Sequence, residues 1–281
     1  MTIREAIRKG TIALKTNNIE EPNIKARLLM QAILNKDRQY LLVYDSEELK
    51  NIQEEKYFKS IDELIGGKPL QHITHSQEFM KMNFFVNEDV LIPRPDTEIL
   101  VEEVIGLCKN KNKVKILDLC TGSGAIAVSL ARYLKNSEVV AVDISKKAIA
   151  ISKKNAKSNK VEDRITFIES DLFQKIKKDK YDVIVSNPPY IKKRLIKTLD
   201  KEVQNEPSIA LDGGEDGLDF YRKIINESYN YLKFGGYLCL EIGYDQKQEV
   251  VDLIKKENKY LSVYTKKDFG GNDRIVIAQI N

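Results

Sequence analysis

The sequence is poor in the residues that build disulfide frameworks and metal sites. Its three cysteines are odd in number, far apart and without any C-x-x-C pair: Cys108, Cys120 and Cys239. We therefore expect no disulfide framework, and the reducing cytoplasm is the expected compartment. The two histidines, His72 and His75, could share one helical face. No nearby cysteine or second histidine pair completes a zinc ligand set, so we expect no metal site.

Long hydrophobic runs and blocks of one charge are also absent. No stretch approaches the roughly 18 apolar residues of a membrane-spanning helix, and the first residues contain no apolar signal core. The net charge of +4 is small against 46 basic and 42 acidic residues, and the lysine pairs are dispersed. This charge allows an anionic partner such as an RNA-bound complex but does not argue for one. We expect a globular protein that acts as a monomer and requires neither a membrane nor direct contact with nucleic acid.

Residues 1–78 are expected to form a small helical domain. Apolar residues recur there at near-helical spacing. Polar breaks and the stop at Gly66 and Gly67 divide this pattern into several short helices. No catalytic constellation occurs among them, so the domain is a plain helical bundle or a module for substrate recognition.

Residues 79–95 are expected to form a β-hairpin linker. Weak alternation around residues 87–89 predicts the hairpin. Arg94 lies between two prolines, which predicts an extended segment. Asp96 or Thr97 is expected to cap a helix that opens at Glu98, and a simple linker with a capping box is the alternative reading.

Residues 96–281 alternate strands with helices, which predicts an α/β domain with a parallel, doubly wound sheet. The predicted strands span residues 114–119, 139–143, 165–169, 181–186, 237–242, 261–264 and 274–280. The predicted helices span residues 125–134, 145–155, 217–232 and 247–255. Because the last two strands are too close in sequence for a helical crossover, we expect them to form an antiparallel hairpin.

The strand of residues 181–186 runs directly into Asn187-Pro188-Pro189-Tyr190. Two prolines cannot continue a helix or a central strand, so this elbow is held at the carboxyl edge of the sheet, where ligands bind. Asn187 would offer a side-chain acceptor beside backbone carbonyls, which matches both hydrogens of a planar NH2 group. Tyr190 could lay its ring against that group. A strand followed by a stiff turn is the alternative.

Acidic residues stand at the ends of three successive predicted strands. The first, Asp118, opens a loop of mostly small residues before a helix: Asp118, Cys120, Thr121, Gly122, Ser123 and Gly124. Such a loop permits close approach of a ligand to the backbone at a helix N-terminus. Asp143, with Ile144 beside it, is placed to bond a pair of ribose hydroxyls. Asp171 could accept from an adenine amine, with Leu172 and Phe173 along the ring.

A nicotinamide cofactor is the main alternative ligand for this loop. Cys120 stands at the first glycine position of G-x-G-x-x-G, however, and Ala125 follows the last. An acidic strand end would repel a pyrophosphate but attract a sulfonium ligand that carries an ammonium group. Each carboxylate alone is explained equally well by a helix cap or a solvated turn. Three of them at successive strand ends favour a binding site.

These motifs resemble those of class I S-adenosylmethionine-dependent methyltransferases, and more narrowly those of the HemK/PrmC family. The residues that carry the resemblance are Ile92-Pro-Arg-Pro-Asp-Thr-Glu98, Asp118-Leu-Cys-Thr-Gly-Ser-Gly124, Asn187-Pro-Pro-Tyr-Ile191, Glu206-Pro207, Gly213-Gly-Glu-Asp-Gly-Leu218 and Glu241-Ile-Gly243. The resemblance implies a Rossmann-like, seven-stranded sheet and S-adenosylmethionine as cofactor. The implied activity is methylation of the side-chain amide nitrogen, N5, of the glutamine in the Gly-Gly-Gln motif of peptide chain release factors.

The sequence departs from the family pattern at three positions. Cys120 and His75 stand where glycine is common, and His72 stands where tyrosine is common. The expected catalytic residues are Asn187, Pro188, Pro189 and Tyr190, with the Asn187 side-chain oxygen and the Pro188 carbonyl accepting the two amide N–H bonds. Two other functions remain open. One is an adenine-N6 methyltransferase acting on DNA or RNA, because the elbow suits any planar NH2 group. The other is a non-catalytic binding protein on the same fold.

Overall fold

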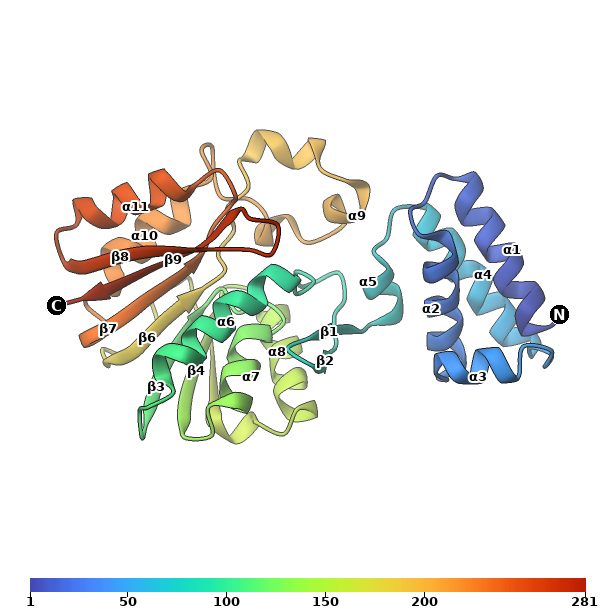
Figure 1. Cartoon of the computed structure of the whole chain (residues 1–281), viewed down its shortest axis with the longest axis horizontal. Coiled ribbons are helices and arrows are strands. Elements are labelled where there is room, and N and C mark those ends of the chain that lie inside the picture. The colour runs from blue at the N-terminus through green and yellow to red at the C-terminus, as the bar shows by residue number, and fades with distance from the viewer. The chain divides into compact units, whose positions relative to one another are not determined.

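The computed structural model describes residues 1–281 and divides into two compact units (Figure 1). The helical unit comprises residues 1–76 together with residues 200–205. The sheet unit comprises residues 77–199 and 206–281. None of the helices combines the length and the apolar character needed to cross a membrane.

The helical unit consists of short helices around one apolar core, as the sequence predicts. They are α1 (Ile3–Thr16), α2 (Pro22–Leu34), α3 (Arg38–Val43), α4 (Asn51–Ile65), α5 (Leu70–Thr74) and α9 (Lys201–Gln204). The buried Tyr57 and Leu64 belong to this core. His75 ends α5 at φ 54°, in the left-handed region. Glycine is the residue that most often adopts this conformation at the end of a helix.

Within the helical unit, residues 200–205 are bound to residues 1–76 through two polar contacts. Glu202 Oε1 lies 2.6 Å from Lys25 Nζ, and Asn205 Nδ2 donates to the carbonyl of Gly67 at 3.0 Å. No pattern in the sequence predicts this return of the chain.

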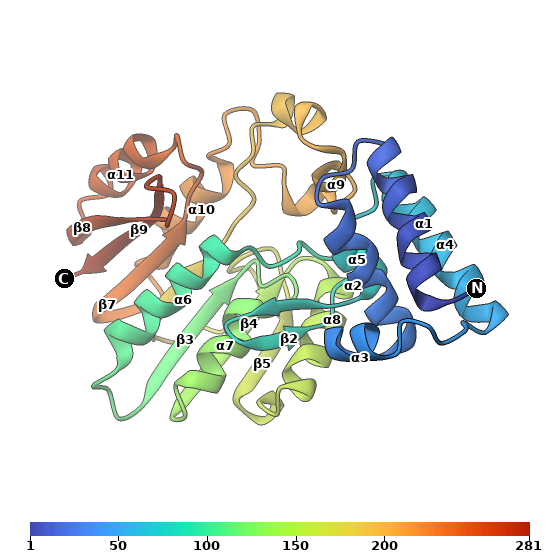
Figure 2. The same ribbon diagram turned by 45° about the vertical axis from the view of Figure 1, so that its right-hand side comes forward.

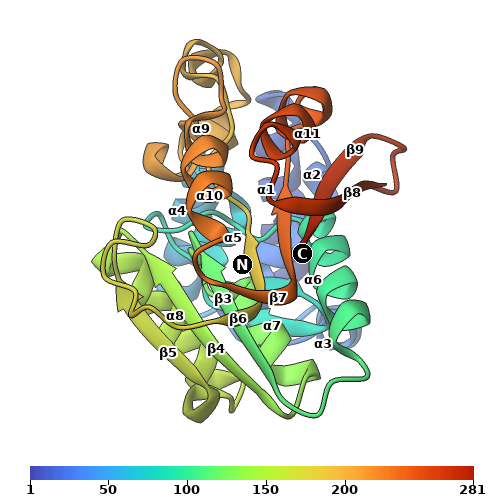
Figure 3. The same cartoon turned by 90° about the vertical axis from the view of Figure 1, so that its left-hand side faces the viewer.

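The sheet unit is built on seven strands in the order β5-β4-β3-β6-β7-β9-β8 (Figure 3). The strands are β3 (Val114–Leu119), β4 (Ser137–Asp143), β5 (Ile165–Glu169), β6 (Tyr181–Ser186), β7 (Leu232–Glu241), β8 (Tyr260–Lys267) and β9 (Asp273–Ile280). The first five in this order pair in parallel, whereas β9 pairs antiparallel with β7 and β8. The predicted doubly wound sheet and its terminal antiparallel hairpin are confirmed.

Helices cover both faces of this sheet. They are α6 (Pro95–Cys108), α7 (Ala125–Tyr133), α8 (Lys146–Ser158), α10 (Asp219–Ser228) and α11 (Lys247–Lys256). Alternate residues of each strand enter different cores. On β6, for example, Val183 packs with α6 and α7, whereas Ile184 packs with α10 and α11. Both faces are therefore buried, which explains the nearly continuous apolar character of the parallel strands.

The hairpin lies earlier in the chain than the sequence predicts. Its strands are β1 (Gln77–Phe79) and β2 (Met82–Phe84) (Figure 2). Residues 87–89 form a separate turn. Met80 and Lys81 both have positive φ, the twist that suits a two-residue hairpin turn. Packing decides the position, since the rings of Phe79 and Phe84 are buried with their centroids 5.9 Å apart.

Two further predicted details are wrong. Helix α6 begins at Pro95 and has no side-chain cap, because proline suits the first helical position and the side chains of Asp96 and Thr97 bond elsewhere. The helix predicted for residues 217–232 is shorter, since α10 ends at Ser228 and β7 begins at Leu232. Gly235, at φ 70°, lies inside that strand. Because glycine is unfavourable in a strand interior, the sequence pattern did not predict a strand at this position.

Two helical glycines provide a matched test of this packing. A Cβ on Gly10 would lie 2.4 Å from the hydroxyl of the buried Tyr57, whereas a Cβ on Gly106 would meet nothing within 4 Å. Gly10→Ala should therefore lower the free energy of unfolding of the helical unit by about 1–3 kcal/mol. Gly106→Ala should raise that of the sheet unit by about 0.5–1 kcal/mol. Both changes in the free energy of unfolding can be measured by urea unfolding, with amide hydrogen exchange in α1 and α6 as the local probe. Equal effects of the two substitutions would contradict this packing.

Candidate active site

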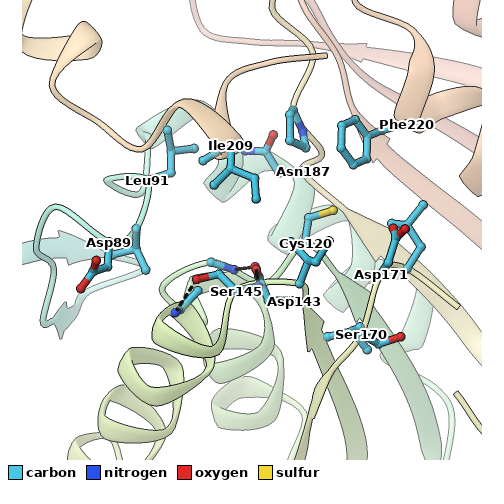
Figure 4. Close-up of a pocket in the computed structure, with 18 of the residues that line it drawn as sticks. Asp89, Leu91, Cys120, Asp143, Ser145, Ser170, Asp171, Asn187, Ile209 and Phe220 are labelled. Carbon is cyan, nitrogen blue, oxygen red and sulfur yellow. Dashed lines mark hydrogen bonds between the residues drawn. The ribbon is translucent and has the colours of Figure 1, made fainter. Parts of the chain in front are cut away.

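A cavity of about 220 Å³ opens at the carboxyl ends of the parallel strands (Figure 4). In Figure 4, Asn187 lies across this cavity from Asp143 and Ser145. The predicted site residues on its wall are Cys120, Gly122, Asp143, Ile144, Asp171, Leu172, Asn187 and Pro189. Topology brings them together, because the carboxyl ends of parallel strands meet at one edge of a sheet.

The loop after β3 is held in a conformation that favours glycine. Cys120, Gly122 and Gly124 have φ values of 60°, 55° and 82°. Cys120 thus occupies a left-handed position, a conformation that glycine adopts without steric cost. A Cβ on Gly124 would lie 2.8 Å from that of Ser152, so space as well as conformation requires glycine at this point.

Asp143 shapes this loop and faces the cavity. Its Oδ2 accepts the N–H of Gly122 at 2.8 Å, and its Oδ1 accepts the N–H of Ser145 at 2.9 Å. Burial raises the pKa of Asp143 against the effect of these backbone donors. Each oxygen keeps a lone pair for a ligand hydroxyl.

Asp118 lies beneath the loop, fully buried, and does not form part of the cavity wall. Its Oδ2 accepts from the hydroxyl of Thr121 at 2.6 Å, whereas no hydrogen bond of normal geometry reaches Oδ1. Burial raises the pKa of Asp118 to about 7. A buried carboxylate oxygen without a partner is unfavourable, and it fits a ligand that brings a positive charge to this loop.

The far end of the cavity is built partly by residues that the sequence did not single out. The half-buried Asp171 accepts from Gln174 Nε2 at 3.1 Å. Phe173, predicted to line a ligand ring, does not lie on the wall; it stacks on Tyr231 with centroids 4.7 Å apart. Phe220 of α10 lines the cavity instead.

The elbow after β6 is held in place by close contacts with Gly213 and Gln246. Gly213 packs so closely that a Cβ there would lie 2.7 Å from the Cα of Tyr190. The carbonyl of Tyr190 accepts from Gln246 Nε2 at 3.0 Å. Neither Pro188 nor Tyr190 lies on the cavity wall, and the half-buried Tyr190 packs against the core shared with α10 and α11. These contacts allow the elbow little freedom to move.

Asn187 belongs to the main cavity and to a smaller one of about 50 Å³ beside it, which Arg94, Thr121 and Ser123 also line. Its Nδ2 donates to Thr97 Oγ1 at 3.2 Å. No hydrogen bond within the protein uses Asn187 Oδ1 or the carbonyl of Pro188. The protein therefore leaves two acceptors of the elbow unused, and of the two residues only Asn187 lies on the cavity wall.

Two glutamates, Glu241 and Glu206, have roles here that the sequence did not predict. Glu241 accepts from the hydroxyl of Thr97 at 2.6 Å, and burial raises the pKa of Glu241 to about 7. Glu206 accepts the N–H of Ile92 at 2.9 Å and pairs with the guanidinium of Arg94. These bonds join two segments that contribute Leu91 and Ile209 to the cavity wall. Both glutamates belong to motifs that carry the family resemblance, Glu206-Pro207 and Glu241-Ile-Gly243. Their partners lie more than a hundred residues away in the sequence, so no local pattern indicates these bonds.

Asp118 generates a prediction about pH. Because its pKa in the folded state is raised above the ordinary 3.8, the folded protein binds this proton more tightly than the unfolded chain does. Stability from this group is therefore lost as the pH rises towards 7. Asp118→Asn should reduce the fall in stability of the ligand-free protein between about pH 5 and about pH 8 by roughly 1–3 kcal/mol.

Urea unfolding at the two pH values tests this, with Asp179→Asn as the control. Asp179 also carries a carboxyl group, but it lies on the surface and its pKa is lowered by Lys115. An unchanged pH dependence in the Asp118 variant would mean that the buried carboxyl group carries no such cost.

Two family models match the chain. The model "PrmC N-terminal domain" matches residues 5–74, and the model "Methyltransferase small domain" matches residues 95–204. Between them they cover the helical unit and the first part of the sheet unit.

Curated relatives match over the full length. A "release factor glutamine methyltransferase" of Clostridium acetobutylicum is 42% identical over 99% of this chain and 98% of its own. A protein of the same name from Moorella thermoacetica is 38% identical, again over 99% and 98%. Among solved structures, the hMettl16 catalytic domain in complex with MAT2A 3′UTR hairpin 6 has a TM-score of 0.57 at 15% identity, with 82% of each chain covered. This last likeness concerns the fold alone.

Proposed function

This chain belongs to the release factor glutamine methyltransferase family, and from that premise we propose that it methylates N5 of the glutamine in the Gly-Gly-Gln motif of peptide chain release factors. One observation carries the assignment to this site. The elbow has two acceptors on neighbouring residues, Asn187 Oδ1 and the Pro188 carbonyl, and no hydrogen bond within the protein uses either of them. A primary amide has two N–H donors, so the two sets match.

S-adenosylmethionine is the methyl donor. When bound, it supplies an electrophilic methyl group, and its sulfur leaves with the bonding electron pair as a neutral thioether. The residues present fit this ligand. Asp118 lies buried below the loop, where its carboxylate charge favours a positively charged ligand group, and Asp143 on the cavity wall offers acceptors for ribose hydroxyls. Asp171 suits the exocyclic amine of adenine, and Phe220 suits the face of its ring.

The chain accelerates the reaction by positioning the substrate. An amide nitrogen is a weak nucleophile, because its lone pair is delocalised into the carbonyl group. Asn187 Oδ1 and the Pro188 carbonyl hold its two N–H bonds, orient the lone pair and favour a more tetrahedral nitrogen. The nitrogen gives up one proton to water as it gains the methyl group. Pro189 and Tyr190 contribute by keeping the elbow rigid, which their close contact with Gly213 supports.

The other functions that the sequence left open are less well supported. An adenine-N6 methyltransferase would use the same elbow, but relatives matching the full length are release factor glutamine methyltransferases by name. A binding protein without activity would not need two unused acceptors beside a cofactor cavity. We further propose that the protein acts as a monomer in the cytoplasm without nucleic acid, and that residues 1–78 recognise the release factor.

Asn187→Ala tests the proposed function. The substitution removes one of the two acceptors, so kcat for a purified release factor should fall by at least about 100-fold. The dissociation constant of S-adenosylmethionine, measured by calorimetry, should change by less than about 3-fold, because the donor's polar groups meet other residues. Transfer of labelled methyl from the cofactor to the release factor measures the rate.

Two controls define the substrate. A release factor whose Gly-Gly-Gln glutamine is replaced by alanine should accept no label, and neither should adenine-containing DNA or RNA oligonucleotides. Label on the oligonucleotides, or on the alanine variant, would refute the proposed function. Full turnover by the Asn187 variant would refute the role of the elbow.

A further inference from the structure

We propose that Thr97 and Glu241 are positioning residues that determine which end of the Asn187 side-chain amide faces the substrate. This inference rests on the proposed function, in which Asn187 Oδ1 accepts an N–H of the target glutamine. Neither residue needs to touch the substrate in this assignment. Both act through Asn187.

While Glu241 is ionised, the hydrogen bonds leave only one arrangement of protons. Glu241 is 1% exposed, and its ionised carboxylate accepts but cannot donate. The Thr97 hydroxyl, 2.6 Å from Glu241 Oε2, therefore gives its only proton to Glu241. The oxygen of Thr97 is left as an acceptor, so the group that faces it at 3.2 Å must be the NH2 of Asn187. Asn187 Oδ1 then points away from Thr97.

This orientation decides whether the elbow can bind an amide. The two ends of an asparagine amide have nearly the same shape, and a half-turn about the Cβ–Cγ bond exchanges them. After such a turn, the Asn187 NH2 would face the NH2 of the target glutamine. Both groups are hydrogen-bond donors, so no hydrogen bond could form between them. The Asn187 side chain also interacts directly with the Glu241 carboxylate, which favours the same orientation. Loss of the bond to Thr97 removes one of these two constraints, so the opposite orientation becomes more populated, and only one of the two supports the reaction.

Three elements contribute to this relay, by which we mean the hydrogen-bonded series Glu241, Thr97 and Asn187. Thr97 lies in the first turn of α6, Asn187 follows β6, and Glu241 is the last residue of β7. Other charged and titratable groups also face Glu241: the guanidinium of Arg274 on β9, the carboxyl of Asp96 on α6, and the hydroxyls of Tyr190 and Tyr221. Arg274 favours the ionised form of Glu241, whereas Asp96 opposes it.

The protonation of Glu241 gives the relay a pH dependence. Burial is the main cause that raises the pKa of Glu241 to about 7. Once protonated, Glu241 can donate to Thr97, and the Thr97 hydroxyl is then free to donate to Asn187 Oδ1. The wild-type kcat should therefore fall as the pH drops through the pKa of Glu241.

Thr97→Val and Thr97→Ser form a matched pair. Valine keeps the shape of threonine but removes the hydroxyl, whereas serine keeps the hydroxyl. For Thr97→Val we expect kcat to fall about 10- to 100-fold, with KM for the release factor and the dissociation constant of the cofactor nearly unchanged. Thr97→Ser should stay within about 3-fold of the wild type.

A second measurement reports the orientation without any turnover. In ligand-free protein with ¹⁵N-labelled asparagine, Asn187→Ala identifies the side-chain NH2 signals of Asn187. One of these protons should exchange slowly with solvent in the wild type and in Thr97→Ser, and quickly in Thr97→Val. Equal exchange in Thr97→Val and wild type, together with unchanged kcat, would overturn the positioning role.

Glu241→Gln keeps the inference testable if Thr97→Val fails to fold. Because glutamine does not titrate, this variant should lose the acidic limb of the kcat–pH profile and have a lower kcat than wild type above about pH 8. Persistence of the same acidic limb in Glu241→Gln would overturn the assignment. Failure of the proposed function is distinct, since the wild type would then transfer no methyl group to release factor at any pH.

Discussion

The register between β3 and β6 is the constraint on which the whole site depends. Leu119 pairs with Ser186, and the Ser186 hydroxyl donates to the carbonyl of Leu119 at 2.7 Å. The next residues, Cys120 and Asn187, therefore leave the sheet side by side, and both line the same cavity. A slip of one residue would exchange the faces of β6, so Ile184 and Val185 would each enter the wrong core. Burial on both faces thus secures the distance between cofactor loop and elbow.

The strand that carries the elbow lies between two strands that end in buried acids. Asp118 on β3 and Glu241 on β7 both have pKa values raised to about 7 by burial. Each ionised group opposes folding, and such groups are concentrated at functional sites. Their uses differ. Asp118 keeps an oxygen without a partner below the loop, whereas Glu241 commits its oxygen to Thr97 and thereby acts on Asn187. Burial of a carboxylate is unfavourable at both positions. At Asp118 the buried charge complements a positively charged ligand, and at Glu241 it orients the Asn187 side chain.

Local patterns and distant contacts explain what the sequence could and could not predict. Strands β3, β5 and β6 match their predicted bounds because β-branched runs there are flanked by polar or turn residues. Phe173 was expected on the cavity wall because it follows Asp171. The left-handed backbone of Leu172, at φ 45°, precedes a Phe173 ring that lies in the core instead. The aromatic residue on the wall, Phe220, comes from a helix that no local pattern links to this loop.

Thr97 shows the same limit for polar residues. At the start of a helix, threonine is typical of a cap, and nothing nearby indicates a partner 144 positions later.

The attachment of residues 200–205 to the helical unit means that the two units cannot be separated by a single cut. A fragment that ended at residue 76 would lose Glu202 as the counter-ion of Lys25 and Asn205 as the donor to Gly67. The remaining fragment would carry a six-residue insert stripped of its packing surface, immediately before the buried Glu206. Excising either unit intact would require a redesigned polypeptide path rather than a truncation.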